Sequence, residues 1–191
     1  SSRTGKVITA EFLIGEVEKL VAEKIKDRDL SEAEKSEITE KVAIGAIKYS
    51  ILKQSIGSDI IYDFEKSISF EGDSGPYLQY SYARAQSVLK KAKTKKIKTS
   101  FKKSPNEISQ LEKDISYFPE VVEKASKEYQ PHFIVLYLTE LAREFNNYYA
   151  NNKIVDSTDE FSSYKVALTE AFSIIMKNGL WLLGINSLEK M

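Results

Sequence analysis

The chain has 191 residues, of which 42% are hydrophobic, and its 28 basic and 28 acidic residues give a formal net charge of zero. This length supports one large domain or two small ones, and the overall charge favours neither nucleic acid nor a membrane surface as a partner. The absence of cysteine excludes disulfides and sulfur-ligated metals, and the single histidine, His132, excludes a multi-histidine site.

No apolar run approaches the length of about 18 residues that a membrane-spanning helix needs. The first residues, SSRTGKVITAEF, also lack the continuous apolar core of a signal peptide. We therefore expect no membrane partner and a reduced, cytoplasmic setting.

Stretches rich in Lys, Glu, Ala, Leu and Ile, with only four prolines and eight glycines in the chain, predict an all-α fold. Thr9 is a candidate N-cap for the first helix. Ser31 and Glu34 form a capping-box pattern for a second helix that we expect to end near Ser55–Gly57. The mixed composition of residues 58–75 indicates a loop-rich connector between this two-helix leader and a bundle of four or five helices.

Three of the prolines mark the later helices. Pro76 suits the first position of a helix, because the N–H that proline lacks would be unpaired there. After a lysine-rich loop over residues 94–104, Ser104 and Pro105 predict the start of another helix, which Pro119 kinks or divides.

The last two helices begin and end at recognisable residues. Pro131 opens the first of them, and a polar loop over residues 156–163 separates it from the second. Gly184 is a plausible terminating glycine for the final helix, because glycine readily adopts the left-handed conformation found there.

The segment Gly72-Asp73-Ser74-Gly75 is similar to the nucleophile segment of a serine protease. A serine nucleophile needs a base within hydrogen-bond reach and a third group that orients the base. The only histidine lies between Pro131 and Phe133, and Gly, Asp and Ser are ordinary residues of turns and caps. We therefore predict that Ser74 caps a helix and performs no catalysis.

The helix after Pro76 carries two different stripes of side chains. One is an ordinary apolar face, made of Leu78, Tyr82, Ala85, Val88 and Leu89. The other, about a third of a turn away, is here called the tyrosine–arginine face and consists of Tyr77, Tyr80, Arg84, Ser87 and Lys91. Phenol rings can stack on nucleobases, and a guanidinium can donate to a base edge or a phosphate.

Residues 90–103 hold eight lysines and no acid, so the rest of this neutral chain carries a net charge of −8. Local positive potential of this kind is expected of a patch that contacts a nucleic-acid backbone. The candidate phosphate contacts, here called the lysine patch, are Lys90, Lys91, Lys93, Lys95 and Lys96. Tyrosines also line protein interfaces and lysine runs also form solvated loops, so a helical protein–protein interaction module remains an alternative.

Four segments, distributed over the whole chain, resemble the arginyl-tRNA synthetase family. They are AIGAIKYSIL followed by IIYDFEKSISFEGDSGPYLQY, then GPYLQYSYARAQSVLKKA, LAREFNNYYANNKIV and GLWLLGINSLEKM. The resemblance implies the helical bundle of the class I synthetase anticodon-binding type. The related bundles of cysteinyl or methionyl enzymes are the alternative within that class, and the PYLQY and terminal matches argue against them.

The resemblance also implies how the chain is divided. The opening SSRTGKVIT is similar to the tail of the class I signature loop, which would occupy residues 1–8, so Ser1, Ser2 and Arg3 would contribute to ATP handling in an intact enzyme. Residues 9–70 would connect a catalytic domain to the anticodon-binding bundle at 71–191. The nucleotide-binding fold and the arginine pocket are missing, which implies a C-terminal fragment without catalytic residues, cofactor or metal. ATP, Mg and arginine would act only in the intact arginine–tRNA ligase.

The implied partner is arginine tRNA, bound at its anticodon loop by a monomer. The contacts that the resemblance implies are Tyr77, Tyr80, Arg84, Tyr149 and Met191. Tyr149 matches an aromatic residue on a facing helix, and Met191 matches a terminal methionine near the loop bases. Helix geometry alone adds Ser87. Lys153 occupies a position where some members have an aromatic side chain, so stacking there is in doubt.

Overall fold

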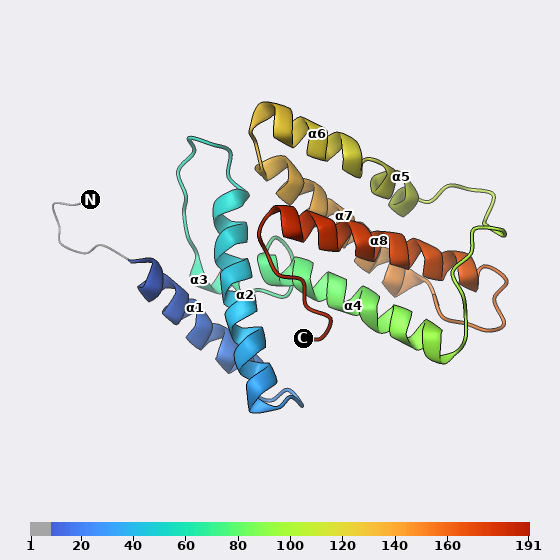
Figure 1. The fold of residues 1–191 in the computed structure, drawn as a ribbon, viewed down its shortest axis with the longest axis horizontal. Coiled ribbons are helices and arrows are strands. Elements are labelled where there is room, and N and C mark those ends of the chain that lie inside the picture. Colours follow the sequence, from blue (N-terminus) through green and yellow to red (C-terminus); the bar gives the residue numbers. More distant parts are fainter. Residues whose placement is uncertain (1–8) are drawn as a thin grey trace.

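The structure, a computed structural model, describes residues 9–191, and within that range its regular secondary structure consists of helices joined by loops (Figure 1). Its helices are α1 (Ala10–Ile25), α2 (Glu32–Leu52), α3 (Phe64–Ser67), α4 (Gly75–Thr94), α5 (Gln110–Ser116), α6 (Phe118–Glu128), α7 (His132–Asn151) and α8 (Ser162–Leu182). The all-α prediction is confirmed. The residues similar to the signature loop, Ser1, Ser2 and Arg3, lie outside the described range.

Side-chain caps start the first two helices where the sequence predicts them. The Thr9 hydroxyl accepts a hydrogen bond from the Phe12 amide at 3.2 Å. At the start of α2, Ser31 accepts from the Glu34 amide and the Glu34 carboxylate accepts from the Ser31 amide, which completes the predicted capping box. Helix α2 ends at Leu52, a few residues before the expected end.

Ser74 is the N-cap of α4, as predicted. Its hydroxyl accepts from the Tyr77 amide at 3.1 Å and donates to the Ser69 carbonyl, and the side chain is buried. Gly72 precedes it with φ of 77°, a left-handed conformation that suits glycine in a tight turn. Both bonding directions of the Ser74 oxygen are therefore used to build the helix start.

The predicted helix start at Ser104 and Pro105 is wrong. The loop continues to Ser109, which forms a capping box with Glu112 at the beginning of α5. The Ser-x-x-Glu pattern occurs twice in this stretch, and only the second copy contains a side chain that packs in the core, the fully buried Leu111. Pro119 lies in the first turn of α6 and so separates it from α5, which confirms the predicted division.

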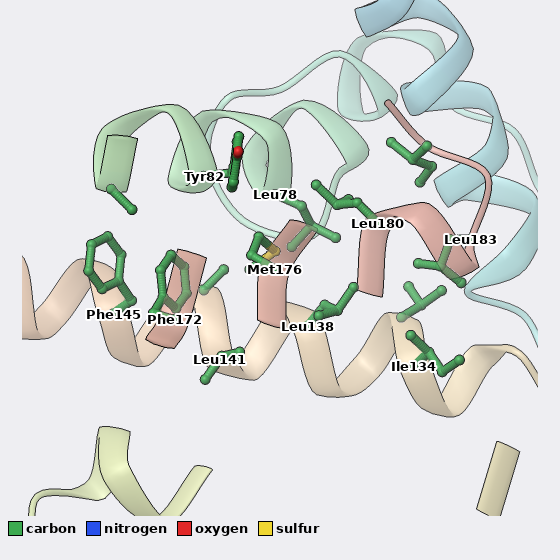
Figure 2. Packing of buried hydrophobic residues seen from close by; sticks show 14 of the residues in the cluster. Leu78, Tyr82, Ile134, Leu138, Leu141, Phe145, Phe172, Met176, Leu180 and Leu183 are labelled. Carbon is green, nitrogen blue, oxygen red and sulfur yellow. The ribbon is translucent and has the colours of Figure 1, made fainter. Parts of the chain in front are cut away.

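The main core lies between α4, α7 and α8 (Figure 2). Phe145 of α7 and Phe172 of α8 stack with ring centroids 3.9 Å apart, and both are fully buried. The other large side chains around them are Leu78, Tyr82, Leu138, Leu141, Met176 and Leu180. This packing holds α4 beside α7 and leaves one face of each helix toward solvent.

Gly184 ends α8 with φ of 65°, as its position in the sequence predicts. The Ile185 amide donates to the Leu180 carbonyl at 2.8 Å and the Gly184 amide donates to the Trp181 carbonyl at 2.9 Å, the two bonds of a Schellman motif. The chain then turns back, so that the C-terminus lies near α2 and α4 (Figure 1).

Helices α2 and α4 cross at two glycines. A Cβ on Gly75 would overlap the carbonyl oxygen of Gly45 and would lie 3.0 Å from the amide nitrogen of Ala46. One turn further, the fully buried Gln79 amide donates to the Lys41 carbonyl of α2 at 3.1 Å and to the Asn186 carbonyl of the C-terminal segment at 2.8 Å. The leader, α4 and the C-terminal segment therefore form one packed junction.

Candidate functional site

The tyrosine–arginine face of α4 lies against α7. Tyr77, Tyr80 and Arg84 occupy successive turns of α4 and are all half-buried, and Tyr149 of α7 is more exposed. The guanidinium carbon of Arg84 lies 4.7 Å from the centroid of the Tyr80 ring and 5.0 Å from that of the Tyr149 ring. The structure thus brings together four of the residues that the sequence analysis selected.

Arg84 is held only by neutral groups. Its Nη1 donates to Oδ1 of Asn146 and its Nη2 donates to the Tyr80 hydroxyl at 3.1 Å. The two tyrosine rings add cation–π attraction, which leaves the positive charge on the guanidinium. Within residues 9–191 no carboxylate forms an ion pair with Arg84.

Asn146 of α7 is the member of this cluster that the sequence analysis missed. Its Nδ2 donates to the Tyr77 hydroxyl at 3.0 Å and to Oγ of Ser81 at 2.8 Å, while its Oδ1 accepts from Arg84. The sequence could have indicated Asn146 through its position three residues before Tyr149, since residues at that spacing share one side of a helix.

A pocket of about 390 Å³ opens beside this cluster. Ser87 and Lys91 line it from α4, and Tyr149, Asn152 and Lys153 line it from the end of α7 and the loop that follows. Lys153 forms an ion pair with Asp156 at 2.8 Å, and this contact holds the pKa of the Asp156 carboxyl below its ordinary value. The pocket therefore joins an aromatic ring, hydrogen-bonding groups and two cations.

A second groove, of about 670 Å³, lies on the other side of Ser87. Lys90 and Lys93 line it from α4, and Glu189 and Lys190 line it from the C-terminal segment. All five residues of the lysine patch are exposed, and none forms an ion pair within the described part of the chain. The structure thus places the patch on the last turns of α4 and just beyond them, next to both hollows.

Met191 is half-buried and packs against the apolar cluster of α1 and α2, which also contains Leu188. Phe70 packs on the same cluster and lies edge-on to the Tyr80 ring, with centroids 6.3 Å apart. Met191 is therefore placed at the junction with the leader, and its contact with RNA bases remains a prediction.

His132 lies in the first turn of α7, half-buried, with its ring 4.3 Å from that of Phe133 and its Nδ1 buried without a hydrogen-bond partner. Residues 9–191 contain no group of three or more acidic, histidine or cysteine side chains placed to hold a metal ion. No helix in the same range has the length and apolar character needed to cross a membrane.

Comparison with known proteins identifies the family to which the sequence is similar. The model of the DALR anticodon binding domain matches residues 78–191. An arginine–tRNA ligase of Clostridium acetobutylicum is 38% identical and covers 100% of this chain and 34% of its own length. One of Pyrococcus furiosus is 35% identical over 93% of this chain and 29% of its own length. The chain spans about a third of the length of these relatives.

Solved structures agree with the sequence matches. The arginyl-tRNA synthetase of Thermus thermophilus superposes with a TM-score of 0.84 at 28% identity, over 98% of this chain and 33% of that protein. That of Plasmodium falciparum shares the fold with a TM-score of 0.73 at 22% identity, over 97% of this chain and 34% of that protein. The chain belongs to the DALR anticodon-binding domain family.

Proposed function

We propose that this chain is the anticodon-loop-binding part of an arginine–tRNA ligase. The observation that carries the proposal is the Arg84 guanidinium, which lies against the rings of Tyr80 from α4 and Tyr149 from α7 without a carboxylate partner in the described part of the chain. Family membership supports it, as do the relatives that are arginine–tRNA ligases.

The chemistry suits an RNA loop. Bases in a loop can be unstacked and read on their edges, and stacking on an aromatic side chain contributes about 1–3 kcal/mol per base. The Tyr77 oxygen accepts from Asn146, so its own hydrogen is available to donate to a ligand. Arg84 would donate to a base acceptor or a phosphate, and the pocket beside Tyr149 would receive an unstacked base. Discrimination would then depend on the middle cytosine that arginine anticodons share.

The lysine patch would strengthen binding without reading sequence. Its cations release counterions from the RNA backbone, so their contribution falls as the salt concentration rises. Ser87 lies between the pocket and the lysine-lined groove, which would let a strand pass from one to the other with its phosphates toward Lys90 and Lys93.

The rest of the proposal concerns the longer protein. Residues 71–191 would be the tRNA-binding bundle and residues 9–70 its connector to a catalytic part that binds ATP, Mg and arginine. Ser1, Ser2 and Arg3 would assist that part, and this chain alone would not activate arginine. We propose that the protein acts as a monomer in the cytoplasm.

A binding assay with two RNA hairpins tests the proposal. One hairpin carries an arginine anticodon, and in the other the middle cytosine is replaced. We expect the replacement to weaken binding about tenfold or more, because it leaves buried hydrogen-bonding groups without partners. Fluorescence anisotropy at two salt concentrations measures it, and the ratio between the hairpins should persist while both affinities fall with salt. Equal binding of both hairpins would contradict anticodon recognition, and no binding of either would favour a protein–protein module.

A further inference from the structure

We infer that Asn146 is a positioning residue, which aims the Arg84 guanidinium at RNA while leaving its positive charge unneutralised. This inference rests on the proposed function, and it adds a residue that neither the family match nor the sequence analysis selects. Its observations are the hydrogen bonds of Asn146 and the neutral surroundings of Arg84.

Arg143 of α7, by contrast, is an arginine whose charge is paired with carboxylates. Arg143 donates to the Glu140 carboxylate at 2.6 Å and lies 3.4 Å from the Asp73 carboxylate. The charge of Arg143 is therefore already balanced by carboxylates of the protein itself. Arg84, one helix away, has an amide in the corresponding role, because Asn146 supplies an oxygen acceptor without a negative charge.

The orientation of the Asn146 amide follows from its neighbours. Ser81 donates its own hydroxyl hydrogen to the Tyr77 carbonyl at 2.8 Å, so its oxygen is left to accept. The Asn146 NH₂ group donates one hydrogen to this Ser81 oxygen and the other to the Tyr77 hydroxyl. Turning the amide over would place this NH₂ group against the guanidinium, donor against donor, so the oxygen must face Arg84.

This arrangement leaves part of the guanidinium available. Arg84 has five N–H groups, and one donates to Asn146 and one to the Tyr80 hydroxyl. The remaining N–H groups have no partner within residues 9–191, and the rings of Tyr80 and Tyr149 lie against the cation. An acceptor from RNA would therefore approach a guanidinium of fixed orientation and full charge.

The first part of the test needs no RNA. In ¹⁵N-labelled wild-type chain, restricted rotation of Arg84 should give separate NMR signals for its two Nη groups. We expect Asn146→Asp, which keeps an acceptor, to preserve the separate signals, and Asn146→Leu, which removes it, to average them. If Arg84 is as restricted in Asn146→Leu as in wild type, Asn146 does not position it and the inference is overturned.

The second part measures affinity for the arginine-anticodon hairpin. Asn146→Asp should weaken binding about tenfold, because a carboxylate beside Arg84 neutralises its charge. In the Arg84→Ala background the same change should cost at most about threefold, since its effect acts through Arg84. Asn147→Asp, an exposed neighbour that receives the same charge, is the matched control and should cost at most about threefold in the wild-type background.

An equal loss for Asn146→Asp with and without Arg84, or an equal loss for Asn147→Asp, would overturn the inference. Failure of the proposed function has a different signature, because the wild type and Arg84→Ala would then bind the hairpin equally. In that case the NMR measurement still decides whether Asn146 positions Arg84.

Discussion

Replacing Arg84 with alanine is expected to weaken binding of the arginine-anticodon hairpin by about 2–3 kcal/mol, or roughly 30- to 150-fold, the cost of losing a charged hydrogen-bond donor. The change also removes the cation that lies against Tyr80 and Tyr149, so both rings lose a contact that orders them. Anisotropy titration of this hairpin and of a hairpin from an unrelated tRNA measures the effect.

Arg143→Ala is the control for this change. Arg143 is exposed, lies on α7 and is paired with Glu140 and Asp73, so its removal should alter affinity less than about twofold. If Arg84→Ala weakens both hairpins equally, Arg84 contacts only phosphate. If it weakens neither, the binding site is not on this face.

The second large effect concerns stability. Gly75→Ala is expected to lower the free energy of unfolding by about 3 kcal/mol or more, because the new methyl group would overlap the Gly45 carbonyl and backbone atoms cannot rotate away. Helix α2 would have to move off α4, and the bonds from Gln79 to Lys41 and Asn186 would open. Urea denaturation monitored by circular dichroism gives the free energy.

Gly15→Ala is the matched control for Gly75→Ala. A Cβ on Gly15 meets nothing within 4 Å, and Gly15 lies inside α1, so alanine should stabilise the chain by up to about 1 kcal/mol. A Gly75→Ala protein as stable as the wild type would show that α2 and α4 do not cross as closely as described.

Local signals in the sequence predicted the helix starts well. Thr9, Ser31 and Ser74 each cap a helix through a bond to an amide three residues away, so their role needs no knowledge of distant segments. Ser104 was misassigned because its pattern is equally good locally. Burial of Leu111 against the bundle, a tertiary contact, selects the second copy of the pattern.

In the candidate site, too, local patterns were predictable from the sequence and contacts between helices were not. The period of one helix was enough to place Tyr77, Tyr80 and Arg84 on one face, since residues three and four apart are neighbours. Asn146 belongs to another helix, and its partners are defined only when α7 packs beside α4. The position of Met191 likewise depends on the turn at Gly184, which directs the last residues toward the leader.

The most direct test of the central claim is photocrosslinking of the chain to the arginine-anticodon hairpin. The hairpin carries 4-thiouridine at the loop positions beside the middle cytosine, and mass spectrometry identifies the crosslinked residues. Binding on the face of α4 and α7 predicts crosslinks at Tyr77, Tyr80 and Tyr149. Crosslinks confined to α1 and α2, or to the lysine-rich loop after α4, would contradict it.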